Sequence, residues 1–180
     1  SIVVVGIAVA LMLISPELVL IFGSPKYHEA VYVIPPVAAS VFFIFIYNIL
    51  SMPQFYYEKT QFLMAASMAA AGANVVLNFI FIHLFGYIAA GYTTLACYML
   101  YSVGHYIVSK RILVNEGIQE NLMNPGFLLA CSVFLIGASI ICNLIFPYRI
   151  LRYAILLASA GLVFWKKELL LKTMADIRKK

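Results

Sequence analysis

The sequence predicts an all-α fold: a polytopic membrane helix bundle with about six transmembrane helices. Of its 180 residues, 64% are hydrophobic and only 11% are charged, and the mean hydropathy is +1.00. Soluble domains contain roughly 45–50% apolar and about 25% charged residues. The chain also contains six apolar runs, each close to the length of about 20 residues that crosses a bilayer as a helix. We therefore expect the chain to lie in a membrane.

Short polar connections separate the six predicted spans. Pro35 and Pro36 lie near the start of the second span, and Pro53 is expected to end it. The sixth span is short and relies on Arg149 and Arg152, whose long side chains reach the interface at one end. The predicted spans are residues 2–22, 31–52, 62–84, 88–109, 126–146 and 148–165.

The connections divide the chain into four predicted parts. These are a four-span core, a polar cytoplasmic loop that is the candidate internal boundary, a final two-span hairpin and a basic amphipathic cytoplasmic tail, at residues 1–109, 110–125, 126–165 and 166–180. In the tail, Leu170, Met174 and Ile177 share one helical face, as in a short interfacial helix on an anionic leaflet. A frayed basic end is the alternative.

Lysine and arginine are distributed unevenly between the two sides that the spans define. Three lie on one side, at Lys26, Arg149 and Arg152, and the other nine of the twelve share the side of the C-terminus. Because positive residues are enriched in cytoplasmic loops, the C-terminus is predicted to be cytoplasmic. The sequence begins at Ser1 without a secretory leader, so we expect a fragment of a longer membrane protein.

No motif of an enzyme, a metal site or a nucleic-acid-binding protein stands out. The seven acidic residues are scattered over loops and span ends, so no carboxylate pair is placed for acid–base catalysis. Cys97, Cys131 and Cys142 lie in apolar runs and are expected to pack as small hydrophobes. We therefore expect no catalysis, no cofactor, no metal and no nucleic-acid partner.

Polar side chains recur at helical spacing in three successive predicted spans. Polar groups inside a span face protein or a water-filled cavity, because hydrocarbon cannot solvate them. The stripes therefore either line a shared polar space or join helices through hydrogen bonds worth roughly 0.6 kcal/mol each, and both interpretations fit the spacing. The candidate substrate-passage residues are Tyr47, Asn48, Ser51, Gln54, Ser67, Asn74, Asn78, Thr94, Tyr98, Tyr101 and His105.

Two lysines in loops are candidates for contact with an anionic head group. Lys59 follows Glu58 just before the third predicted span, and Lys26 lies near His28 on the other side of the membrane. The alternative for both lysines is an ordinary solvated loop.

Three motifs follow one another in the first part of the chain. Residues 16–30 read PELVLIFGSPKYHEA, residues 56–60 read YYEKT, and residues 73–100 read ANVVLNFIFIHLFGYIAAGYTTLACYML. Over residues 10–110 their order resembles the C-terminal half of the Wzx-like oligosaccharide flippases of bacteria. These flippases belong to a superfamily that also contains the multidrug and toxic-compound extrusion antiporters. The matching positions are Pro16, Phe22, Gly23, Tyr27, Ala30, Asn74, Asn78, Gly86, Ala89 and Ala90.

This resemblance implies a fold and a function. Relatives have two lobes around a central cavity, so the chain would form most of the C-terminal lobe and would need the missing N-terminal lobe as a partner. The implied function is the flipping of undecaprenyl-diphosphate-linked oligosaccharides across the bacterial cytoplasmic membrane, for capsule, O-antigen or similar polysaccharides. The other partners would be this lipid-linked oligosaccharide and membrane lipid. Ala89 stands where many relatives have glycine. Because relatives move substrate by rocking two lobes, a single lobe is expected to be inactive.

Two other functions compete with this expectation. A cation-coupled drug antiporter of the same superfamily normally needs a buried acidic residue in mid-span, whereas Glu17 and Glu29 lie near an interface. A membrane-embedded glycosyltransferase or polymerase usually has long outer loops with clustered charged residues, and the longest loop predicted here is cytoplasmic.

Overall fold

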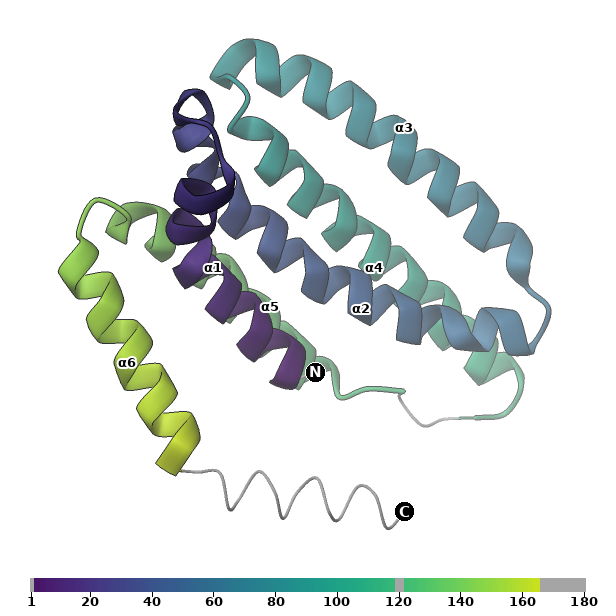
Figure 1. The fold of residues 1–180 in the computed structure, drawn as a ribbon. Coiled ribbons are helices and arrows are strands. Elements are labelled where there is room, and N and C mark those ends of the chain that lie inside the picture. Colours follow the sequence, from purple (N-terminus) through teal and green to yellow (C-terminus); the bar gives the residue numbers. More distant parts are fainter. Residues whose placement is uncertain (1, 119–121, 166–180) are drawn as a thin grey trace. The chain divides into compact units, whose positions relative to one another are not determined.

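The protein is an all-α helical membrane bundle (Figure 1), as the sequence predicts. The computed structural model describes residues 2–118 and 122–165, and all regular structure within these ranges is helical. The predicted tail at residues 166–180 lies outside the described residues. The elements are α1 (Ile2–Phe22), the 3₁₀ helix η1 (Pro25–Tyr32), α2 (Ile34–Tyr56), α3 (Thr60–Phe85), α4 (Ala89–Asn115), α5 (Pro125–Ile145) and α6 (Arg149–Trp165).

Four of these helices, α1, α2, α3 and α5, are long and apolar enough to cross a membrane. The described part of α4 is long enough at 27 residues, but tyrosines, hydroxyls, His105 and two basic residues lower its hydropathy. The described part of α6, Arg149–Trp165, has 17 residues. Among the described residues, each of the six predicted spans thus corresponds to an α-helix, and four of these helices have the length and composition of a span.

The chain divides into two compact units, Ser1–Asn143 and Leu144–Lys180. This division differs from the boundary predicted at residues 110–125. Helix α5 belongs mostly to the first unit, where the Asn143 amide donates hydrogen bonds to the Tyr92 hydroxyl (2.8 Å) and the Tyr32 carbonyl (3.3 Å). All the residues considered for the candidate site lie in the first unit.

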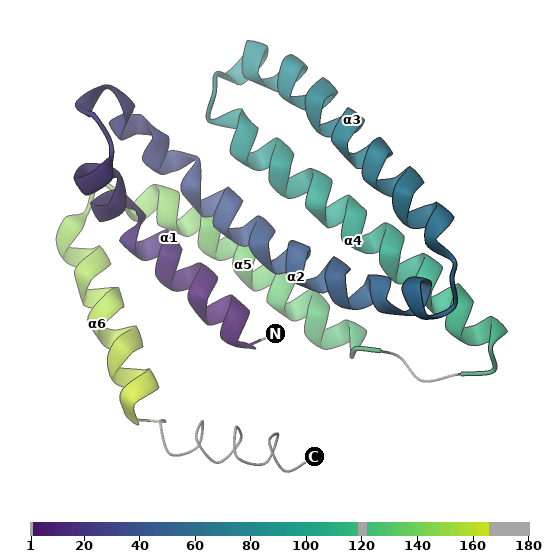
Figure 2. The same ribbon diagram turned by 45° about the vertical axis from the view of Figure 1, so that its right-hand side comes forward.

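The core of the first unit is the seam between α2 and α4. Helix α3 lies along α4 on one side, and α1 lies along α2 (Figure 2). The seam is tight because Gly91 has no side chain: a Cβ there would lie 2.8 Å from Pro36 Cγ and 2.9 Å from the Val33 carbonyl oxygen. Further along α2, Phe42 and Leu50 are fully buried. By contrast, α3 has no buried residue, so this helix contributes one side of a surface groove rather than core.

Helix α2 does not end at Pro53, and that prediction is wrong. Proline lacks an N–H donor, but its carbonyl can still accept, and the Tyr57 amide donates to the Pro53 carbonyl at 3.0 Å. The helix closes through a Schellman motif, in which the amides of Glu58 and Lys59 donate to the carbonyls of Phe55 (3.1 Å) and Gln54 (2.8 Å). Glu58 holds the left-handed position, with φ 55°.

Helix α4 ends in the same way, later than predicted. It runs to Asn115, so residues 110–115 are helical rather than part of the predicted cytoplasmic loop at 110–125. Gly117 takes the left-handed position with φ 78°. The amides of Gly117 and Ile118 donate to Val114 (3.1 Å) and Leu113 (2.8 Å). The basic pair at Lys110 and Arg111 therefore lies within the helix, before its last turn.

Candidate functional site

A groove of about 440 Å³ lies between α2, α3 and α4. Six of the eleven predicted passage residues line it, one from α2, two from α3 and three from α4. The remaining positions are small or apolar. The complete lining is Tyr47, Ser67, Ala70, Ala71, Asn74, Val75, Thr94, Cys97, Tyr98 and Tyr101. Within the described part of the chain, the structure thus brings together polar stripes from three successive helices.

Helical periodicity explains why these residues meet. Thr94, Tyr98 and Tyr101 are spaced at i, i+4 and i+7, which places them on one face of α4. Ser67 and Asn74 occupy the facing side of α3, seven residues apart. The small residues between them on α3 leave the space open instead of filling it.

The wall of the groove towards α2 is aromatic. The rings of Tyr47 and Tyr98 are nearly parallel, at 8°, with their centroids 6.4 Å apart. The ring of Tyr101 lies 4.7 Å from that of Tyr47 and is tilted by 60°. The Tyr101 hydroxyl also forms a 2.6 Å hydrogen bond with the Ser67 hydroxyl. This bond joins α4 to α3 across the groove.

The two asparagines of α3 have different roles. Asn74 lines the groove. Asn78 lies one turn further on and joins helices: its amide nitrogen donates to Asn74 Oδ1 at 3.0 Å, and its own Oδ1 accepts a hydrogen bond from the Thr93 hydroxyl of α4. Sequence reasoning missed Thr93. The sequence does contain a feature that could have identified Thr93. Asn78 and Thr93 are almost equidistant from Gly86 in the turn, so an antiparallel α3–α4 hairpin places them opposite each other.

Gln54 and His105 are buried between α2 and α4 instead of lining the groove. The Gln54 amide nitrogen donates to His105 Nδ1 at 2.8 Å and to Ser109 Oγ at 3.0 Å. The Ser109 hydroxyl donates to the Leu50 carbonyl. With Nδ1 as acceptor, the ring proton of His105 lies on Nε2, which has no hydrogen-bond partner among the described residues.

His105 nevertheless touches the aromatic wall. Its ring lies edge-on to that of Tyr101, at 4.5 Å and 88°, and 5.8 Å from that of Tyr47. Phe62 of α3 contacts the same imidazole at 5.6 Å. His105 therefore packs behind the tyrosines and limits the orientations that their rings adopt.

The remaining predicted residues lie away from the groove. Asn48 is exposed and donates to the Ile44 carbonyl of its own helix at 2.7 Å, while Ser51 is buried and donates to the Asn48 carbonyl at 2.9 Å. Lys59 follows the end of α2, and Lys26 lies in η1; both are exposed. Neither lysine lines the groove.

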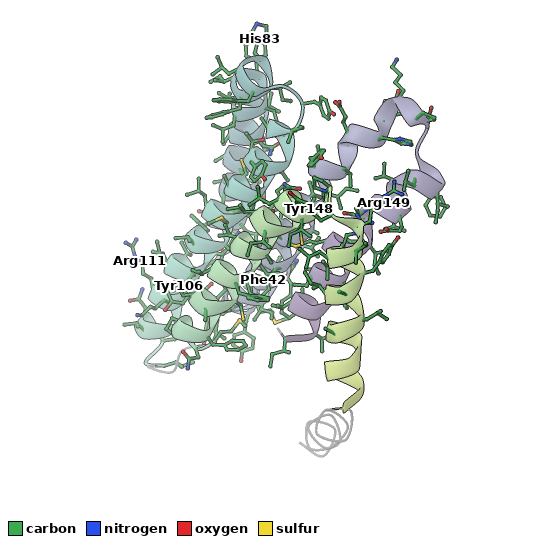
Figure 3. The ribbon with its side chains drawn as sticks, turned by 90° about the vertical axis from the view of Figure 1, so that its left-hand side faces the viewer. Phe42, His83, Tyr106, Arg111, Tyr148 and Arg149 are labelled. Carbon is green, nitrogen blue, oxygen red and sulfur yellow. The ribbon has the colours of Figure 1, made fainter. Side chains whose placement is uncertain are left out.

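A second polar contact joins η1 to the α3–α4 turn. The Tyr87 hydroxyl donates to the Glu29 carboxylate at 2.9 Å. Partial desolvation of the phenol, together with the hydrogen bond and negative charge of Glu29, raises the pKa of Tyr87 above its ordinary value. His83 lies nearby in sequence but is exposed at the end of α3, at the opposite end of the α3–α4 hairpin from Arg111 (Figure 3).

In the described part of the chain, no three His, Cys, Asp or Glu side chains gather as potential metal ligands. Comparison of the sequence and structure with models of protein families, with curated proteins and with solved structures found no match.

Proposed function

We propose that the protein takes part in flipping undecaprenyl-diphosphate-linked oligosaccharides from the inner to the outer leaflet of a bacterial cytoplasmic membrane, for surface polysaccharide synthesis. It acts as a transporter and not as an enzyme. In this proposal its C-terminus is cytoplasmic, and a second lobe of the same protein completes the passage.

One observation carries the proposal: within an apolar bundle, six hydroxyl and amide side chains from three helices line a single groove. Polar groups at membrane depth are costly unless they face protein or a wet cavity, and such groups commonly mark substrate pathways. A lipid-linked sugar needs a hydrophilic surface for its head while its tail stays in the bilayer. The groove offers such a surface along α3, the helix with no buried residue.

The lack of an acidic residue in the groove lining weighs against a cation antiporter. None of the ten lining residues is acidic, whereas binding a drug cation inside a membrane favours a nearby carboxylate. The resemblance over residues 10–110 to the oligosaccharide flippases points in the same direction as the groove.

The test is a deletion of the intact gene in its host, followed by extraction of lipid-linked oligosaccharides and a probe of their accessibility from outside the cell. We expect complete repeat units to accumulate on the cytoplasmic leaflet and surface polymer to disappear. Complementation with Asn74→Ala or Tyr98→Ala should restore less polymer than the wild-type gene, while Asn48→Ala, outside the groove, should restore it fully.

Two other results would replace the proposal. Unchanged lipid-linked pools with increased sensitivity to cationic drugs would indicate an antiporter. Incomplete repeat units, with no accumulation of complete ones, would indicate a glycosyltransferase.

A further inference from the structure

The groove has a chemistry more specific than that of a general polar passage. We propose that it is a subsite for one uncharged pyranose sugar, stacked on the aromatic wall of Tyr47 and Tyr98 and held by neutral hydrogen-bonding groups. This inference rests on the proposed transport function and adds a substrate class to it: neutral sugars bind here, and acidic sugars and the diphosphate do not.

The aromatic wall supplies the stacking surface. Because the rings of Tyr47 and Tyr98 are parallel to within 8°, their faces point in the same directions. An aromatic face carries negative partial charge, so it attracts the weakly positive C–H groups on the flat side of a pyranose ring. The hydrogen bond between Tyr101 and Ser67 and the contact between Tyr101 and His105 hold the third ring in place.

The polar groups of the groove suit sugar hydroxyls. Among the described residues, no hydrogen-bond partner is found for the hydroxyls of Tyr47, Tyr98 and Thr94, nor for the amide nitrogen of Asn74. A hydroxyl both donates and accepts. The groove therefore combines donors and acceptors that are available to a ligand, as recognition of a polyhydroxylated molecule requires.

The described lining of the groove has no charged side chain, so we expect anionic ligands not to bind there. None of the ten residues that line the groove is basic. A uronate or diphosphate there would lose hydration without gaining a counter-charge, which is strongly unfavourable in a membrane interior. The volume of about 440 Å³ lies within the range of roughly 300–1,000 Å³ typical of small-molecule sites.

The test is saturation-transfer NMR on the full chain in lipid nanodiscs, without sugar-based detergents. The probes are methyl β-D-glucopyranoside and methyl N-acetyl-β-D-glucosaminide, compared with sodium glucuronate and inorganic diphosphate. We expect the neutral glycosides to bind at least about tenfold more tightly than the two anions, a difference of about 1.4 kcal/mol. Equal binding of glucuronate or diphosphate, or no binding of either neutral glycoside, would overturn the inference.

Variants locate the binding. Tyr98→Ala should weaken binding of the neutral glycosides about tenfold, because the ring face is lost, and Tyr98→Phe should retain most of it. Tyr106→Ala is the matched control, since Tyr106 lies on the same helix outside the groove and contacts Lys110. Equal weakening by Tyr106→Ala would contradict the inference. If Tyr98→Ala does not fold, Thr94→Val, which replaces a groove hydroxyl with a methyl group, tests the same groove. It should weaken binding of the neutral glycosides, and unchanged binding would contradict the inference.

The binding test and the cellular test fail separately. If neutral glycosides bind selectively but lipid-linked oligosaccharides do not accumulate in the deletion strain, the subsite stands and the transport proposal falls. If oligosaccharides accumulate but glucuronate binds as tightly as the glycosides, transport stands and the subsite falls.

Discussion

Asn78 illustrates how one hydrogen-bonded side chain joins two helices. It donates to Asn74 on its own helix and accepts from Thr93 on the next one. Asn74, one turn earlier, leaves its amide nitrogen available at the groove. A single polar stripe thus divides into a residue that joins α3 to α4 and a residue that faces the groove.

Thr93→Val should destabilise the protein by about 0.6–1 kcal/mol, because it removes the hydroxyl that Asn78 Oδ1 accepts from and keeps the side-chain shape. The measurement is the free energy of unfolding in detergent titrations. In a double-mutant cycle with Asn78→Ala, the two changes should be non-additive. Asn48→Ala, whose amide bonds only within α2, is the control, and an equal loss there would contradict the prediction.

Glu58 occupies a left-handed backbone position that favours glycine. Glu58→Gly should raise the free energy of unfolding by about 1 kcal/mol, because it relieves the clash between Cβ and the backbone. Gly117→Ala, at the equivalent position after α4, should lower it by a similar amount. Thermal unfolding of the two variants in the same nanodiscs measures both changes, and shifts of the same sign would refute the explanation.

At the scale of elements, the start of α4 lies close against the start of α2. Pro35 and Pro36 stand in the first turn of α2, where the fixed φ of proline suits a helix start. Gly91 packs directly against Pro36 and Val33. The position of α4 relative to α2, and therefore of the tyrosines in the groove, depends on this contact.

Gly91→Ala should cost about 1–3 kcal/mol, because the new methyl group overlaps a proline ring and a backbone carbonyl. In the same helix, a Cβ added at Gly104 would meet only the Phe62 ring, at 3.7 Å. Gly104→Ala should therefore leave the free energy of unfolding unchanged or raise it, because alanine is the better helix former. Comparison of melting temperatures for the two variants tests the packing. An unchanged melting temperature for Gly91→Ala would show that the contact of Gly91 with Pro36 and Val33 does not fix the position of α4.

The contact between η1 and the α3–α4 turn should depend on pH. Because the folded-state pKa of Tyr87 is raised, its stabilising contribution is complete below the unfolded phenol pKa of about 10 and is lost as the pH rises through the folded value. Difference titrations of tyrosinate absorbance between wild type and Tyr87→Phe measure this pKa. Glu29→Gln should lower it, since the carboxylate charge is removed, and an unchanged pKa would exclude Glu29 as a cause.

At the scale of the whole molecule, periodicity and composition predict much of the fold and part of the candidate site. The stripe of Thr94, Tyr98 and Tyr101 could be predicted because spacing alone places residues on one helix face. The burial of Gln54 and His105 could not, because it depends on α4 covering the end of α2. Pro53 was misplaced as a helix end because the Schellman motif that follows it uses a glutamate where glycine is the usual signal.

The predicted orientation can be tested with cysteine labelling. In a background with Cys97, Cys131 and Cys142 replaced by alanine, Lys26→Cys should react with an impermeant maleimide added to intact cells. Lys59→Cys should react only after the membrane is opened. Both lysines are exposed, so access depends on the side of the membrane. The reverse pattern would invert the topology.

The near-equal distances of Asn78 and Thr93 from Gly86 have a consequence for sequence variation. One residue added to or removed from the turn between α3 and α4 would rotate the facing surfaces by about 100° relative to each other. The tyrosines of α4 would then no longer oppose Asn74 and Ser67. Among chains that share this groove, the length of the turn should therefore be invariant, and insertions should be tolerated elsewhere before they are tolerated there.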